Sequence, residues 1–355
     1  MAYIYRTSDS TPRYYPACVF VSEFYVGEDY SGRRMVMRRN NMESDWGEAS
    51  AAVVLGGTDD KESEMPGHLS MTWLSAAEAK CYALEKHIDS EAIAKLWEET
   101  DDEGYNLFKF IVVGMAPYGG VALWLRGEKK SVLVDWTKAE ETDPYSEETA
   151  EFFAKCTPEQ FSALALARDE TVLQYLQEHG LPPTDQYDHW MKQYKSRYVV
   201  LEEYWDGEAW KKYKKSDLYY DDMDIRYIEE ERYDGTHCRM YDTSLMRYHK
   251  AGIPKRTVVS WKEGAFEFQT FFWFNHEAME KVLDRFFALD PKAKANILMR
   301  MDTRNQHYEL ALKGGALEEP VALPQEAYEM LVFRGSDEFW RSPNFSQEDE
   351  KAWEW

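Results

Sequence analysis

The sequence predicts an α+β protein with two tandem, similar lobes, each an antiparallel sheet with helices on one face, joined by a helical segment. Three observations predict this class: a length of 355 residues, a composition that is 44% hydrophobic, and an internal repeat. A chain with this length and apolar content can bury two cores and is not disordered. We therefore expect residues 1–183 to form the N-terminal lobe with its helical connector, and residues 184–355 to form a C-terminal lobe that is a degenerate repeat.

The repeat relates residues 68–97 to residues 255–283, because both begin as an alternating strand and end as a helical stretch. The positions that we pair between the copies are Trp73 with Trp261, Glu78 with Glu267, and Tyr82 with Phe271. Residues 108–127 and 294–315 continue the match, each with two strands and a closing glycine. The preserved order of strand, helix, strand and strand favours duplication over chance similarity.

Each repeat has the periodicity of a strand followed by a helix. Alternation of Leu69, Met71 and Trp73 predicts a strand with one face on a core. After it, Asp89 and Asn275 are the residue types that cap helix N-termini, so a helix is expected to follow each of them.

A helical connector is expected between the lobes, over residues 146–178. Ser146, Thr157 and Asp169 each have the sequence of a helix start. The apolar residues expected to pack these helices together are Phe152, Phe153, Phe161, Leu164 and Leu173. The Gly-Leu-Pro-Pro run at residues 180–183 ends the connector and sets the predicted boundary.

Charge and composition exclude several classes of function. The formal net charge is −23, which argues against binding to nucleic acid and to anionic lipid, since both need clustered Lys and Arg. No signal peptide or apolar run of membrane-spanning length is present, so we expect a cytoplasmic protein that makes no membrane contact. The four cysteines are scattered and the histidines lack zinc-ligand spacing, so we expect no metal and no cofactor.

The segment 216–231 is the candidate partner-binding site. It holds seven acidic residues against one base, Arg226, and its tyrosines alternate with carboxylates. Tyrosine makes contacts at low entropic cost, which favours a docking surface; a solvated strand edge is the alternative. A calcium loop would need a central glycine, which this segment lacks. The predicted contact residues are Asp217, Tyr219, Tyr220, Asp221, Asp222, Asp224, Tyr227, Glu229, Glu230 and Glu231.

A second acidic segment, residues 135–148, precedes the helical connector. We interpret it as a solvated connection. Its carboxylates could form a glycosidase pair only if two of them faced each other across a cleft, and no pattern in the sequence places them so.

Residues 66–82, together with the strand pair after the first helix, resemble a bacterial family known only as domain of unknown function 2931. The residues that carry the resemblance are Pro66, Trp73, Ser75, Glu78, Tyr82, Gly114, Pro117, Gly119, Val121, Trp124, Leu125 and Gly127. The resemblance covers roughly residues 15–135, and the C-terminal half keeps the pattern loosely. It implies no catalytic residue. The resemblance does imply a role, because some relatives are associated with interbacterial toxin loci as immunity proteins. Toxins of the Rhs or type VI secretion kind are the expected context.

These observations together predict an immunity protein without catalysis of its own. We expect it to be a monomer that binds one cognate toxin domain, a nuclease or an NAD-dependent ADP-ribosyltransferase, through that toxin's basic cleft. Two alternatives remain open at this point. One is a non-enzymatic, envelope-associated or scaffold protein. The other is a hydrolase that reverses a toxin's modification, for which Glu78, Glu267, His237 and Asp222 are the residues to substitute.

Overall fold

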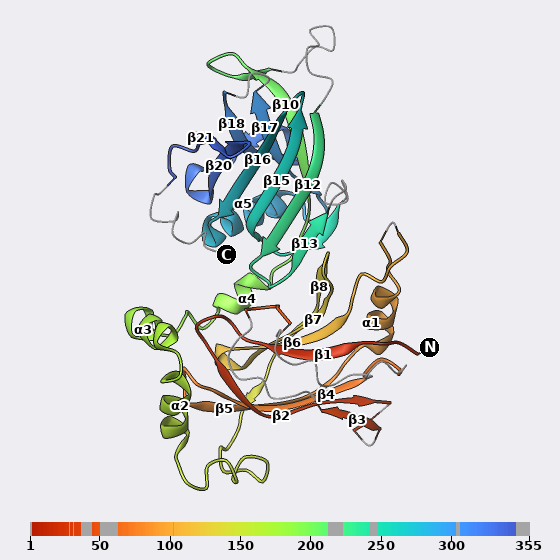
Figure 1. Ribbon diagram of the computed structural model, residues 1–355, viewed down its shortest axis with the longest axis vertical. Helices are drawn as coiled ribbons and strands as arrows, with labels where there is room; N and C mark the ends of the chain where they lie inside the picture. Colours follow the sequence, from red (N-terminus) through yellow and green to blue (C-terminus); the bar gives the residue numbers. More distant parts are fainter. Residues whose placement is uncertain are drawn as a thin grey trace. The chain divides into compact units, whose positions relative to one another are not determined.

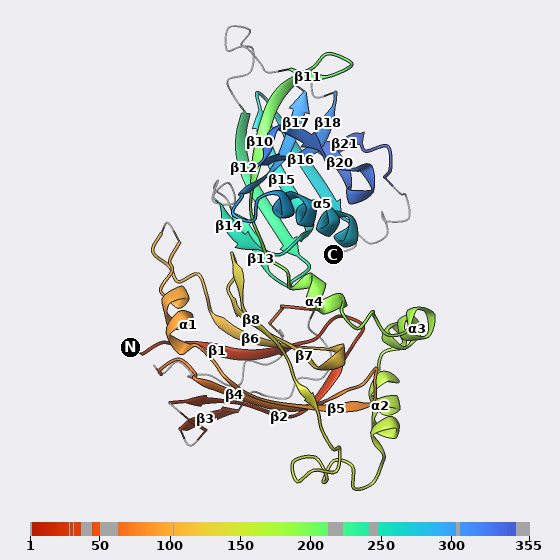
Figure 2. The same cartoon turned by 180° about the vertical axis from the view of Figure 1, so that it is seen from behind.

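Figures 1 and 2 show a computed structural model of the chain. The residues that it describes are 2–27, 29–30, 32–36, 45–49, 63–101, 103–211, 223–240, 248–302 and 306–345. The chain divides into two compact units. Unit 1 comprises Met1–His189 and Asp234–Thr236, and unit 2 comprises Trp190–Tyr233 and His237–Trp355.

Unit 1 contains two sheets and a group of helices. Its strands are β1 (Arg6–Ser10), β2 (Ala17–Val26), β3 (Arg33–Val36), β4 (His68–Ser75), β5 (Lys80–His87), β6 (Phe110–Ala116), β7 (Gly120–Arg126), β8 (Ser131–Lys138) and β9 (Glu140–Glu141). The first sheet has the order β1-β6-β7-β8, and the second has the order β3-β2-β4-β5-β9. The helices are α1 (Ser90–Trp97), α2 (Pro158–Leu166), α3 (Glu170–His179) and α4 (Gln186–Trp190), with a 3₁₀ turn, η1, at Pro117–Gly119.

The core of unit 1 lies between its two sheets, which stack face to face in Figures 1 and 2. Trp73 of β4 is fully buried and meets Ile111 and Leu123 of the opposite sheet in one apolar cluster. Ile93 and Trp97 of α1 join the same cluster, so the helix presents one apolar stripe to the core.

Unit 2 also contains two sheets. Its strands are β10 (Tyr194–Trp205), β11 (Trp210–Lys211), β12 (Met223–Arg232), β13 (His237–Met240), β14 (His249–Ala251), β15 (Pro254–Glu263), β16 (Phe266–Phe274), β17 (Ala295–Asp302), β18 (Tyr308–Gly314), β19 (Leu317–Ala322), β20 (Tyr328–Arg334) and β21 (Asp337–Arg341). The sheet orders are β11-β10-β17-β18-β19, with β14 paired to β10, and β13-β12-β15-β16-β20-β21. The helix α5 spans His276–Leu289, and a 3₁₀ turn, η4, spans Gln325–Ala327.

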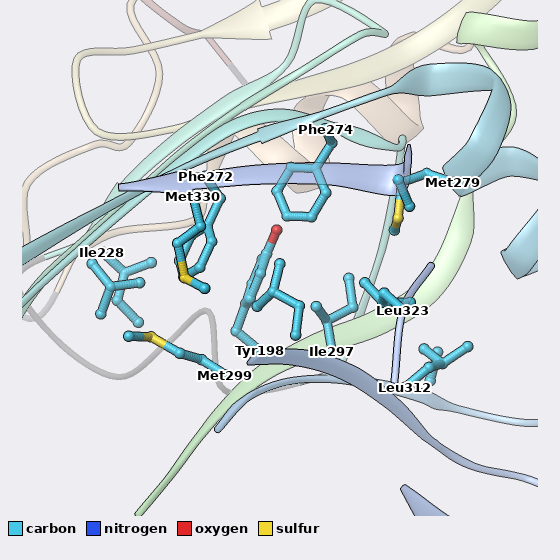
Figure 3. Close-up of a cluster of buried hydrophobic side chains, with 14 of the residues drawn as sticks. Tyr198, Ile228, Phe272, Phe274, Met279, Ile297, Met299, Leu312, Leu323 and Met330 are labelled. Carbon is cyan, nitrogen blue, oxygen red and sulfur yellow. The ribbon is translucent and has the colours of Figure 1, made fainter. Parts of the chain in front are cut away.

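The core of unit 2 is one cluster to which both sheets and α5 contribute. Figure 3 shows Tyr198, Ile297 and Met299 from one sheet against Phe272 and Met330 from the other. Met279 places the first turns of α5 in the same cluster.

The two units pair their strands in the same order. In unit 1, β1 runs parallel to β6, β2 pairs with β3 and β4, and β4 forms a hairpin with β5. In unit 2, β10 runs parallel to β17, β12 pairs with β13 and β15, and β15 forms a hairpin with β16. In both, a helix then leads from the hairpin to three antiparallel strands of the other sheet.

The structure is a sheet-rich form of the predicted α+β class, but the prediction of a single antiparallel sheet in each half is wrong. Each unit has two sheets, and one pair in each unit is parallel. The difference arises because the chain changes sheets through α1 and α5, and because β1 and β10 lie far in sequence from the strands that they join.

The repeat alignment needs a correction within the hairpin. Trp73 pairs across the strands with Tyr82, whereas Trp261 pairs with Phe268, so Phe268 and not Phe271 corresponds to Tyr82. The pairing of Glu78 with Glu267 is wrong as well, because Glu78 lies in the turn and Glu267 lies within β16. The reason is turn length. Residues 76–79 connect the hairpin of unit 1, while residues 264–265, with Gly264 at φ 56°, connect the shorter hairpin of unit 2.

The predicted helix caps are confirmed. The Asp89 carboxylate accepts from the Ala92 N–H at 2.9 Å, and the Asn275 side chain accepts from Ala278 N–H at 3.0 Å. Thr157 forms a capping box with Gln160 at the start of α2, and Asp169 caps α3.

The prediction of a helix at Ser146 is wrong, because residues 146–156 form turns. The Thr149 hydroxyl donates to the Pro144 carbonyl at 2.6 Å and lies 3.0 Å from the Ser146 hydroxyl. These local hydrogen bonds compete with helical ones, as Ser and Thr side chains commonly do. Leu164, predicted to pack, is 67% exposed.

Candidate protein-binding site

Of the predicted contact residues, part lies on β12 and part lies outside the described residues. Those outside are Asp217, Tyr219, Tyr220, Asp221 and Asp222, while for Asp224 only the backbone is described. Tyr227, Glu229, Glu230 and Glu231 are described. β13 and β15 pair with Glu229, Glu230 and Glu231 from both sides, so the alternative of a sheet edge is wrong for these three residues, while Tyr227 lies before the pairing with β13.

Tyr227, Glu229 and Glu231 lie at alternate positions and share one face of β12. The Tyr227 hydroxyl donates to the Glu229 carboxylate. Arg239 lies 3.0 Å from the same carboxylate, and Arg256 lies 3.1 Å from Glu231. These carboxylates are therefore neutralised by their neighbours, and they contribute less negative potential than the sequence alone indicates.

Glu230 points the other way, into the interior of unit 2, and is 3% exposed. Its carboxylate pairs with Arg232 at 2.6 Å. The Tyr198 hydroxyl donates to Glu230 at 3.3 Å and lies 2.9 Å from the Thr257 hydroxyl. Burial raises the pKa of Tyr198 well above its usual value. The Glu230 carboxylate therefore forms an ion pair and a hydrogen bond inside unit 2 and is not available at the surface.

The second acidic segment has the geometry of a fixed surface feature. We call residues 140–151 the acidic loop. It begins as β9, which pairs with β5. Within it, the Asp143 carboxylate accepts from Tyr145 N–H at 2.9 Å, and Thr149 is completely buried. Glu148 accepts from the Thr72 hydroxyl of β4 at 2.6 Å, which ties the loop to the sheet.

The acidic loop is exposed and carries no Lys or Arg of its own. Its exposed acidic residues are Glu140, Glu141, Asp143, Glu147, Glu148 and Glu151. Glu141 pairs with Lys80 at 2.6 Å, and no other Lys or Arg in the described part of the chain forms an ion pair with the loop. Tyr145 is 55% exposed, and its ring packs edge-on against Phe153 with centroids 6.2 Å apart.

This loop could not be recognised from the composition of residues 135–148 alone, which is that of an ordinary solvated connection. The sequence signal of the loop is the combination of a tyrosine with six carboxylates and no base over a few residues. No pattern in the sequence indicated that Thr72 and Thr149 would fix the loop.

The residues named for a hydrolase lie on separate elements. Glu78 sits in the β4–β5 turn, Glu267 is exposed on β16, and His237 begins β13, while Asp222 lies outside the described residues. No group of three or more His, Cys, Asp or Glu side chains within the described ranges has the arrangement of a metal site.

Glu78 has a structural position in unit 1. One of its carboxylate oxygens accepts from the Tyr82 hydroxyl at 2.8 Å, and the other accepts from Tyr118 N–H at 2.9 Å. Tyr118 has φ 62°, in the left-handed region, and Gly119 follows at φ 72°. A side chain at Gly119 would meet the Ala139 carbonyl at 2.8 Å. The Glu78 carboxylate therefore holds a strained turn between β6 and β7.

The comparisons with known proteins give one match. The model of a family described as "Protein of unknown function (DUF2931)" matches residues 2–183, which is more than half of the chain. The chain belongs to this family. No curated protein and no solved structure matches it. The match supports the resemblance given by Trp73, Glu78 and Tyr82, and it extends beyond the residues that carried that resemblance.

The residues typical of the family serve folding in this chain. Trp73 and Trp124 are fully buried, and Gly114 leaves room for the Trp124 ring, which a Cβ there would approach to 2.4 Å. The family pattern thus marks a scaffold, and a partner-binding feature has to be sought elsewhere. In the described residues, no helix is both long and apolar enough to cross a membrane.

Proposed function

We propose that this protein is an immunity protein that binds a cognate interbacterial toxin domain and occludes its active site without catalysis of its own. The observation that carries the proposal is the acidic loop of unit 1: it presents six carboxylates and an exposed tyrosine on a fixed backbone. We propose this loop in addition to residues 216–231, of which Glu229 and Glu230 are buried and the other predicted residues stay predicted contacts.

Electrostatics supports a basic partner. A chain of net charge −23 accelerates its encounter with a positively charged cleft, and complementary charge favours the right orientation at contact. Enzymes that act on nucleic acid or on NAD bind anionic substrates and therefore carry such clefts, so a nuclease or an ADP-ribosyltransferase is the class of toxin that we propose. The toxin locus, of the Rhs or type VI secretion kind, comes from the family resemblance.

Preorganisation supports tight binding. Thr72 and Thr149 already hold the acidic loop, so little conformational entropy is lost when a partner closes on it. Tyr145 supplies a large contact surface with few rotatable bonds, as tyrosine does in many interfaces. Inserted into a cleft, the loop excludes substrate by volume and by charge, and no bond is made or broken by this chain.

We also infer that unit 2 is a degenerate second copy of the family domain. The shared pairing order, the two capped helices α1 and α5, and the buried tryptophans Trp73 and Trp261 support a duplication. An experimental structure in which the equivalent strands of the two units fail to superpose would contradict it.

The experiment measures binding to the toxin domain encoded by the neighbouring reading frame. We expect a complex with a dissociation constant of nanomolar order, and we expect the wild-type protein to inhibit the toxin at equal concentration. The double variant Glu147→Lys and Glu151→Lys should slow association at least tenfold at low salt, with a smaller effect at high salt.

The matched control is the double variant Glu318→Lys and Glu319→Lys on β19, which changes the net charge equally at two exposed positions of unit 2. This control should leave the association rate within about threefold of the wild-type rate, because it reduces only the negative electrostatic field of the whole protein. Absence of a complex at micromolar concentration contradicts the proposed function. An equal effect of both double variants shows that the acidic loop is not the contact.

A further inference from the structure

An apolar groove opens in unit 1 next to the acidic loop. Its volume is about 170 Å³. The residues that line it are Cys18, Val19, Phe20, Phe152, Phe161, Leu164, Ala165 and Arg168. They come from β2, from the turns that follow the acidic loop, and from α2 and the turn after it. The groove therefore lies where residues 152–168, which we call the connector segment, cross the outer face of the β3-β2-β4-β5-β9 sheet.

The walls of the groove are held by aromatic packing. Phe20 stacks at a tilt on Phe152, with centroids 4.6 Å apart, and meets Phe161 edge-on at 6.0 Å. Phe153 packs against both Phe20 and Phe161 and connects this group to Tyr145 of the acidic loop. Cys18 also lines the groove and is 6% exposed, and its burial raises the pKa of the thiol to about 11.

The size and the rim of the groove indicate what fits it. Apolar cavities of about 150 Å³ accept a benzene ring, so this groove has room for one leucine or phenylalanine side chain. Leu164 of α2 lies at the rim of the groove. Its side chain is 67% exposed, although apolar residues line the groove beside it. Contact with an incoming apolar side chain would remove this surface from water, which stabilises a complex.

Charge near the groove selects the flanks of the incoming segment. Glu151 directly precedes the lining residue Phe152, whereas Glu159, two positions before Phe161, lies on the side of α2 opposite the lining residues. Both are exposed. Arg168 is the cation among the lining residues, and the exposed Lys155, three positions after Phe152, is a second cation nearby; the six carboxylates of the acidic loop outnumber these two cations. With the acidic loop beside it, the groove is an apolar site in a negative surround, which fits an apolar side chain that basic residues flank.

We infer that this groove receives one leucine- or phenylalanine-sized side chain of the protein partner, at a position that Lys or Arg residues flank. The inference rests on the proposed function, in which the partner is the toxin domain. A second copy of this chain is disfavoured as the occupant, because two chains of net charge −23 repel each other.

The groove and the acidic loop make separable contributions to binding. Charges at a rim act mainly on the association rate, whereas a buried apolar contact acts mainly on the dissociation rate. The acidic-loop variant should therefore slow association, and a groove variant should speed dissociation, of the same complex.

The test compares two leucines that are equally exposed. Leu164→Glu introduces a charge into the rim of the groove, and Leu289→Glu does the same at the end of α5 in unit 2, where the leucine is also 67% exposed. Binding of the toxin domain is followed by biolayer interferometry. We expect Leu164→Glu to raise the dissociation rate at least tenfold and Leu289→Glu to leave it within about twofold. Because each variant adds the same negative charge, the difference reports the apolar contact.

A second measurement does not depend on the toxin. The probe is a fluorescein-labelled peptide with one phenylalanine between two pairs of lysines, and its control has alanine in place of phenylalanine. Fluorescence anisotropy at low salt should show at least tenfold tighter binding of the phenylalanine peptide to the wild-type protein. Leu164→Glu should remove this preference, and Leu289→Glu should retain it.

The outcomes separate the two proposals. If the toxin binds both leucine variants equally, the groove inference is overturned and the proposed function stands. If the toxin does not bind the wild type but the peptide preference depends on Leu164, the groove inference stands and the proposed function is wrong. If neither probe responds to Leu164→Glu, or if the wild type sediments as a dimer that this variant dissociates, the inference of a basic partner is overturned.

Discussion

Unit 1 and unit 2 pair their strands in the same order, but they use the outer face of the corresponding sheet differently. In unit 1, Phe20 and Leu74 lie under Phe153 and Ala165 of the connector segment, so that face is apolar and covered. In unit 2, Glu229 of the equivalent strand pairs with Arg239 at that face. The inner faces of the two units are therefore alike and apolar, while the outer faces of the corresponding sheets differ.

The inner faces agree in chemistry as well as in order. Trp73 and Trp261 occupy the same position of the first hairpin strand. The Trp73 ring packs at a tilt against Tyr82 across the hairpin, and the Trp261 ring stacks on Phe268. The features that we assign to function, the acidic loop and the groove, belong to the connector side of unit 1.

The largest expected effect tests whether the two tryptophans are equivalent. Trp73→Ala and Trp261→Ala should each lower the free energy of unfolding by about 3–5 kcal/mol, because each removes a fully buried aromatic side chain. Urea denaturation followed by circular dichroism measures both, with the exposed Tyr105→Ala as a control near zero. A large loss of stability for only one of the two variants would show that Trp73 and Trp261 are not equivalent in the two units.

The buried ion pair distinguishes unit 2 from unit 1. Arg232 and Glu230 have side chains that are 6% and 4% exposed, and no pair between described residues of unit 1 has both partners this deeply buried. Arg232→Met should cost about 3–5 kcal/mol, since it leaves Glu230 buried without its partner. The double variant with Glu230→Leu should recover much of the loss in the same urea assay. Failure of the double variant to recover stability would show that Tyr198 and Thr257 depend on the carboxylate.

The covered face of unit 1 predicts an alkaline weakness. Burial raises the pKa of Cys18 to about 11, above its ordinary value of 9.0, so the unfolded thiol ionises first as pH rises. The stability that the neutral thiol contributes is complete below pH 9 and is lost as pH rises toward 11. At pH 10 the loss is about 1.4 kcal/mol relative to pH 8. Urea titrations of wild type and Cys18→Ala at both values measure it, and parallel pH dependences would contradict the assignment.

The helix caps should give the smallest difference. Asp89→Ala and Asn275→Ala each remove one side-chain acceptor at a helix N-terminus, so each should cost about 1 kcal/mol. Equal losses of stability would show that the two caps contribute equally to α1 and α5, whereas a loss for only one variant would contradict this. Substitution by Gly, which is tolerated at this position, should cost only a few tenths of that in either unit.

Local signals in the sequence were sufficient for the caps, for the buried tryptophans and for the strand pairs β6–β7 and β17–β18. They did not reveal β5 and β16, so the hairpins β4–β5 and β15–β16 were missed and the predicted order of strand, helix, strand and strand is wrong at that point. Asp89, Asn275, Thr157 and Asp169 could be identified because capping depends on a few adjacent residues. The division of each unit into two sheets could not be predicted, because β1 and β10 join strands far along the chain and short apolar runs do not specify their neighbours.

The site was harder to predict than the fold. The acidic content of β12 was visible in the sequence, but the arginines that neutralise Glu229 and Glu231 come from β13 and β15 and could not be assigned in advance. Conversely, the acidic loop has the sequence of an ordinary connection. It is fixed by two hydrogen bonds, from the Thr72 hydroxyl to Glu148 and from the Thr149 hydroxyl to the Pro144 carbonyl. Tertiary contacts, which a pattern does not contain, decided both cases.

The parallel strand pair that closes each unit has a consequence for how the chain folds. Arg6 pairs with Phe110, and Ser196 pairs with Ala295, so each closing contact joins residues about a hundred positions apart. On the ribosome, the first strand of each unit is synthesised long before its neighbour exists, while the hairpins can form at once. Such distant pairing slows folding, and it leaves the edge of β6 or β17 open in an intermediate. We therefore expect the rate of refolding to be limited by the pairing of β1 with β6 and of β10 with β17.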